Sequence, residues 1–72
     1  MKVWEFLYCS CIYESAYGTM SLHMTVEGAY KAMKEHQLQD FYDWRSLPNE
    51  YRKNYKAGTH KSWCVRSREI LD

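Results

Sequence analysis

The feature that most limits how this chain can fold is its load of aromatic side chains in a short sequence. The 72 residues include seven tyrosines, three tryptophans and two phenylalanines. A chain of this length builds one small apolar core, which cannot enclose so many large rings. We therefore expect a single domain, spanning residues 1–72, that leaves several rings exposed to solvent or to a binding partner.

The length of the chain also limits its stability. A core of this size gives a net stability of only about 3–5 kcal/mol unless a disulfide, a metal or a second subunit adds to it. Self-association would raise that margin. A homodimer is therefore one of our hypotheses.

Charge is distributed unevenly along the sequence. The net charge is +1, but residues 1–30 carry −2, residues 31–44 carry −1 and residues 45–72 carry +4. The last third is thus basic and the rest mildly acidic, a balance that excludes neither acidic nor basic partners.

The first apolar run and the cysteines indicate a cytoplasmic protein. The run from Val3 to Tyr8 is interrupted by Glu5 and is too short for a signal peptide or a membrane span. The three cysteines are an odd number without a secretory signal, which argues against a disulfide framework. We expect reduced thiols and no membrane partner.

Two segments near the start alternate as strands do. Residues 3–12 are rich in aromatic and β-branched residues, with Trp4, Phe6 and Tyr8 on one face. Their other face is also apolar, which predicts a central strand covered on one side by a helix. Residues 19–24 predict a half-buried antiparallel strand, whose polar face carries a solvent-exposed His23.

The helical period begins after Thr25, a good N-cap residue. It predicts a helix over residues 26–44 that packs with the stripe from Ala29 to His36, with Tyr30 and Phe41 on the packing side. Pro48 interrupts it, a second helix follows over residues 49–56, and residues 61–71 alternate as a last strand. The sequence predicts an α+β fold in β-β-α-α-β order, with a three-stranded antiparallel sheet and one long and one short helix.

Reactive groups are present but lack the spacing that chemistry requires. Cys9, Cys11 and Cys64, with a histidine, are suitable zinc ligands, yet Cys-x-Cys lacks the usual two to four intervening residues. Cys64 lies among cations that favour a thiolate, but its place in an alternating strand favours a core role. No phosphate-binding loop or hydrolase motif is present. We predict no enzymatic activity, no metal and no cofactor.

Binding is the better supported prediction. In the last third, cations alternate with Tyr51, Tyr55 and Trp63, a pattern that suits single-stranded nucleic acid, an acidic protein surface or a solvated basic face. At the end of the long helix, Phe41, Tyr42 and Trp44 suit either a protein interface or packing on the last strand. The expected partner-binding residues are Tyr42, Trp44, Tyr51, Arg52, Lys53, Tyr55 and Lys56.

The overall pattern resembles the small orphan proteins of tailed bacteriophages. The resemblance lies in Ser21 to Ala29 leading into a helix with Ala32-Met33, and in a final strand with Trp63-Cys64-Val65 before Glu69-Ile70-Leu71. It implies a small accessory protein that binds and inhibits or modulates an enzyme or defence protein of its host. We therefore expect a non-catalytic protein-binding module, with nucleic-acid or nucleotide binding through the basic third as the alternative.

Overall fold

The computed structural model describes residues 1–54 and 56–71 and has the predicted α+β architecture. Its elements, in chain order, are β1 (Lys2–Cys9), β2 (Gly18–His23), α1 (Val26–Arg45), α2 (Asn49–Asn54) and β3 (Ser62–Glu69). The strands form one antiparallel sheet in the order β2-β1-β3, so β1 is central as predicted. None of the described helices is both long and apolar enough to cross a membrane.

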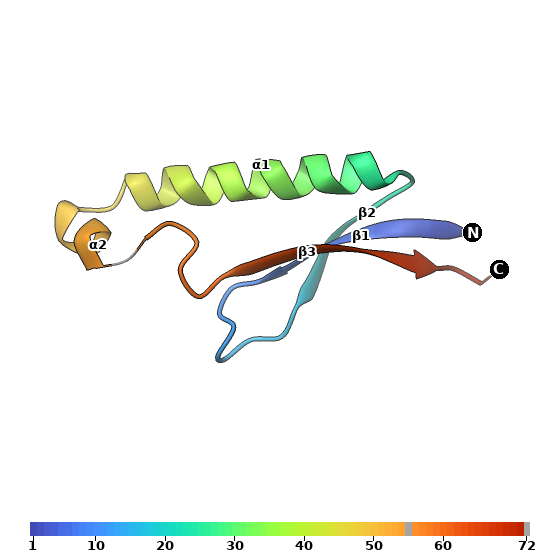
Figure 1. Cartoon of the computed structure of the whole chain (residues 1–72), viewed down its shortest axis with the longest axis horizontal. Coiled ribbons are helices and arrows are strands. Elements are labelled where there is room, and N and C mark those ends of the chain that lie inside the picture. The colour runs from blue at the N-terminus through green and yellow to red at the C-terminus, as the bar shows by residue number, and fades with distance from the viewer. Residues whose placement is uncertain (55, 72) are drawn as a thin grey trace.

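Helix α1 runs along one face of the sheet and extends beyond it toward α2 (Figure 1). Thr25 caps it as expected, because its side chain accepts a hydrogen bond of 3.1 Å from the amide of Gly28. Ala29 is fully buried, and the ring of His36 lies 4.4 Å from that of Tyr8 and 5.5 Å from that of Phe6. The predicted stripe on α1 and the aromatic face of β1 therefore meet in the core.

The face of strand β2 that lies toward the helix is not the predicted one. Ser21 and His23 lie opposite Phe6 and Trp4 on the side of α1, and both are partly buried. The His23 ring comes within 3.4 Å of where a Cβ on Gly28 would stand, so the glycine leaves room for it beneath the first turn of α1. The expectation of a solvent-exposed His23 was wrong. The apolar residues of this segment are more than half exposed: Met20, Leu22 and Met24.

Two other expectations need correction. Strand β1 ends at Cys9 rather than at residue 12, because the carbonyl of Cys11 accepts hydrogen bonds from the amides of Glu14 and Ser15 and closes a turn there. Tyr30 and Phe41 of α1 are 46% and 40% exposed, so they do not belong to its packing side.

The molecule is thin and elongated, with principal extents of 51 × 24 × 11 Å. Its radius of gyration is 14.4 Å, whereas a compact chain of this length has about 11 Å. Its accessible surface is 5587 Å², against about 4,700 Å² for a typical monomer of this mass. The radius of gyration and the accessible surface are large because α1 covers only one face of the sheet and because α2 lies beyond the end of α1 (Figure 1).

Candidate functional site

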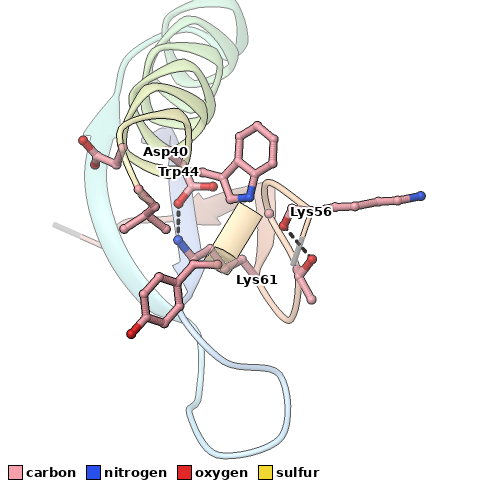
Figure 2. A pocket seen from close by; sticks show the side chains of 9 residues that line it. Asp40, Trp44, Lys56 and Lys61 are labelled. Carbon is pink, nitrogen blue, oxygen red and sulfur yellow. Dashed lines mark hydrogen bonds and ion pairs between the residues drawn. The ribbon is translucent and has the colours of Figure 1, made fainter. Parts of the chain in front are cut away.

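The clearest hollow in the described residues lies where α1 ends, between that helix, α2 and the loop that leads into β3 (Figure 2). Its volume is about 320 Å³, within the range of small-ligand and side-chain pockets. The residues that line it are Asp40, Asp43, Trp44, Leu47, Tyr51, Lys56, Gly58, Thr59 and Lys61.

An ion pair between Asp40 and Lys61 forms one wall of this pocket (Figure 2). The side chain of Asp40 is 8% exposed and that of Lys61 is 33% exposed. The hydrogen bond to Asp40 raises the pKa of Lys61 above its ordinary value, against the opposing effect of burial. Because both charges are used in the pair, this wall contributes little net charge to the pocket.

A tight turn shapes the opposite wall of the pocket. Gly58 has a φ of +76°, a left-handed conformation that glycine adopts without strain. The Thr59 hydroxyl donates a hydrogen bond of 2.6 Å to the carbonyl of Lys56, which fixes the turn. The Trp63 ring packs against Gly58, and its Nε1–H donates a hydrogen bond of 2.9 Å to Nδ1 of His36. The turn is thereby joined to the core beneath α1.

Three of the six predicted partner-binding residues that the structure describes line the pocket: Trp44, Tyr51 and Lys56. Trp44 is half-buried and its ring lies 5.8 Å from that of Phe41, whereas the Tyr51 side chain is 57% exposed. The Lys56 side chain extends away from Asp40 and Trp44 (Figure 2). It is exposed and has no ion-pair partner among the described residues.

The other three predicted residues that the structure describes, Tyr42, Arg52 and Lys53, lie outside the pocket lining. Tyr42 is exposed on α1 with its ring 6.0 Å from that of Phe41, and Lys53 is exposed on α2. Arg52 is half-buried and donates a hydrogen bond to the side chain of Asn49, while its buried Nε has no partner in the part of the chain that is described. Tyr55 falls outside the described residues.

Our prediction missed Asp40 and Lys61, although their positions in the sequence indicate a pair. Asp40 lies four residues after His36 on α1, so it extends the stripe that faces the sheet. A carboxylate on a buried stripe needs a cation, and a lysine just before the last strand is in position to supply one.

The basic residues of the last third do not form one surface. Arg52, Lys53 and Lys56 lie at the α2 end, whereas Arg66 and Arg68 lie on β3 toward the other end (Figure 1). Trp63, which the sequence placed among them, is half-buried and hydrogen-bonded to His36. The pattern in the sequence is thus divided between two sites in the fold.

The described residues contain no group of three or more histidine, cysteine, aspartate or glutamate side chains placed to hold a metal ion. The three cysteines are free thiols, and Cys9 is buried with its Sγ 3.2 Å from the carbonyl oxygen of Ser15. The pocket lining combines apolar walls with two carboxylates, Asp40 and Asp43, and the Lys56 side chain carries its ammonium group away from Asp40 and Trp44 (Figure 2). Such a site suits an apolar side chain whose acidic neighbour stays outside the pocket, beside Lys56.

No match to this chain was found among protein-family models, curated proteins or solved structures. The geometry and charge of the site therefore carry the functional interpretation.

Proposed function

We propose that this chain is a non-catalytic protein-binding module whose pocket at the end of α1 receives an apolar side chain from an acidic segment of another protein. The observation that supports this most is the pocket of about 320 Å³ with Trp44, Leu47 and Tyr51 in its lining. Aromatic side chains around a pocket are the usual anchors of protein interfaces. Buried area of this kind contributes affinity at low entropic cost.

Charge favours an acidic partner at this end of the molecule. Residues 45–61 contain five cations and one carboxylate. Within the described part of the chain, Lys61 is the one of these cations in an ion pair, with Asp40, while Asp43 adds a further carboxylate to the pocket lining. The exposed Lys53 and Lys56 at this end speed association with an acidic surface and select against basic ones. The resemblance to small phage proteins makes a host enzyme or defence protein the partner class to test first.

The test is affinity capture from cell extract with four immobilised chains: wild type, Trp44→Ala, Tyr51→Ala and the control Tyr30→Ala. Tyr30 is 46% exposed near the start of α1 and is not among the residues that line the pocket. A true partner is retained by wild type and control and binds at least about 30-fold more weakly to the two pocket variants, as for interface residues that contribute 2 kcal/mol or more. Circular dichroism verifies that each variant is folded.

Two outcomes contradict the proposal. A partner that binds Tyr51→Ala and Trp44→Ala as tightly as wild type does not use the pocket. Capture that disappears after nuclease treatment, or that falls steeply with salt in proportion to phosphate contacts, indicates the nucleic-acid alternative instead. The retained protein, once purified, should bind in a one-to-one ratio by calorimetry.

A further inference from the structure

The second face of the sheet is covered by the β1–β2 loop at one end, where the Cys9 thiol donates a hydrogen bond to the Ser15 carbonyl and the Tyr17 and Ser62 hydroxyls are hydrogen-bonded. The other end has a chemistry of its own. Helix α1 packs on the face that carries Phe6 and Tyr8, and no described helix packs on the opposite one (Figure 1). The paired strand positions on that open face are Val3, Glu5, Leu7 and Cys9 of β1, Thr19 and Leu22 of β2, and Ser62, Cys64, Arg66 and Arg68 of β3.

A fully buried carboxylate lies at the centre of this open face. Arg68 Nη1 donates a hydrogen bond of 3.1 Å to Glu5 Oε1, and Arg66 Nε and the Thr19 hydroxyl each donate one of 3.3 Å to Oε2. Burial opposes ionisation of Glu5, but the hydrogen bond from Arg68, the charge of Arg66 and the hydrogen bond from Thr19 outweigh it and lower its pKa. Glu5 is therefore an anion that orients two guanidinium groups.

The two guanidinium groups keep most of their binding capacity. Arg66 and Arg68 are 65% and 59% exposed, and each contacts Glu5 through one nitrogen. Their remaining N–H groups have no partner among the described residues, so each retains a free edge for a carboxylate. One carboxylate against two arginines leaves a net charge of +1 on this face.

Charge and composition select the partner of this face. A second copy of the chain would bring another pair of arginines against the first, which is unfavourable. A single-stranded nucleic acid needs rings beside the cations for base stacking. The exposed ring of Tyr17 is hydrogen-bonded to Ser62 at the start of β3, four residues before Arg66, so it does not stand beside the two arginines. Leu22, which lies opposite Glu5, is 52% exposed and offers an apolar contact beside the arginines.

We propose that the open face of the sheet is a second docking surface, on which the free edges of Arg66 and Arg68 bind carboxylates of an acidic, aliphatic protein segment. Glu5 is a positioning residue that holds both arginines in place before the partner arrives. This surface lies on the sheet and is independent of the pocket at the end of α1, so either proposal can fail without the other.

The test is an NMR titration of the ¹⁵N-labelled chain with a hexapeptide in which glutamate and valine alternate. We expect the amide signals of Arg66, Arg68 and Glu5 to shift as the peptide binds. The same peptide with glutamine in place of glutamate should bind with an affinity at least about tenfold lower. R66Q/R68Q should lower the affinity for the acidic peptide by at least about tenfold. K31Q/K34Q, which removes two exposed charges from α1, should leave that affinity unchanged.

Loss of both arginines leaves Glu5 buried without cations and can unfold the chain. The triple variant E5Q/R66Q/R68Q removes the unpaired charge as well, and it should be folded and should not bind the acidic peptide. Equal affinity for the two peptides, or binding that survives in the triple variant, would overturn the proposal. The proposal would also be overturned if a twelve-nucleotide oligothymidylate bound at these amides more tightly than the acidic peptide, or if the chain self-associated and R66Q/R68Q abolished that association.

Discussion

Glu5 and Asp40 are both buried carboxylates that bind cations, but their surroundings differ. Glu5 receives donors from both neighbouring strands, in positions that the sheet register sets. Asp40 binds Lys61, which lies in the loop just before β3. The comparison teaches that the sheet fixes its charged cluster by regular geometry, whereas the pocket depends on a loop and on α2, a helix that buries no side chain.

The largest effect that tests this contrast is a cavity in the core. Phe6→Ala should cost about 3–5 kcal/mol, because Phe6 is 3% exposed and packs against His36. That loss equals most of the net stability of so small a domain, so the variant should be largely unfolded by circular dichroism. Tyr51→Ala at the α2 end should change the free energy of unfolding by only about 0.5 kcal/mol. A folded Phe6→Ala protein would show that the core lies elsewhere.

The next effect concerns the pocket wall. Asp40→Asn removes the charge that pairs with Lys61 and should lower the free energy of unfolding by about 1–2 kcal/mol, since Lys61 is partly solvated and can recover some hydration. Urea denaturation measures this change. Asp43→Asn is the matched control, because Asp43 is exposed on the same helix and its carboxylate accepts a hydrogen bond from the exposed Gln39. Equal effects of the two substitutions would show that the Asp40 pair contributes nothing.

A pair of glycines gives a smaller effect. Gly58→Ala forces a Cβ into a left-handed backbone and should cost about 1 kcal/mol. Gly18→Ala, at the start of β2, meets no atom within 4 Å and has no positive φ, so it should be neutral or slightly stabilising. Thermal unfolding of both variants measures the difference. A neutral Gly58→Ala would mean that the turn beside the pocket is free to rearrange.

The smallest expected effect is a difference in pH dependence between the Glu5 cluster and the Asp40–Lys61 pair. The pKa of Glu5 lies below its ordinary 4.5 in the fold, so its contribution is fully present above about pH 4.5 and is lost as the pH falls through the folded pKa. The pKa of Lys61 lies above its ordinary 10.5, so its contribution is fully present below about pH 10.5 and is lost as the pH rises through the folded pKa.

Stability curves of two variants check this assignment. Glu5→Gln should flatten the acid side of the pH dependence and leave the alkaline side unchanged. The double variant Asp40→Asn/Lys61→Met, which leaves no carboxylate of this pair without its cation, should flatten the alkaline side. Urea midpoints across the pH range provide the measurement. A variant that flattens the wrong side would contradict the assignment.

Local signals in the sequence were sufficient to predict the fold. Thr25 as the N-cap, the break at Pro48 and the alternation of β1 each depend on neighbours along the chain, and the structure has all three. The face of β2 was predicted wrongly for a physical reason. Alternation alone puts apolar residues toward the core, but the space beneath Gly28 accommodates His23 and turns Leu22 outward.

The candidate site was predicted only in part. Trp44, Tyr51 and Lys56 were identified by residue type, because exposed rings near cations are recognisable in sequence. The pairing of Asp40 with Lys61, and of Glu5 with Arg66 and Arg68, depends on contacts across 21 or more positions. Sequence alone shows the charges but not which of them meet.

The chain ends have a practical consequence for every measurement proposed above. Met1 and Ile70 are joined by two hydrogen bonds, from the Met1 amino group to the Ile70 carbonyl at 3.0 Å and from the Ile70 amide to the Met1 carbonyl at 2.8 Å. The start of β1 and the end of β3 lie opposite α2 (Figure 1). A surface tether or a fluorescent fusion at Met1 therefore leaves the Trp44 pocket at the far end of the molecule, whereas the attachment lies close to Arg68, which is paired with Val3.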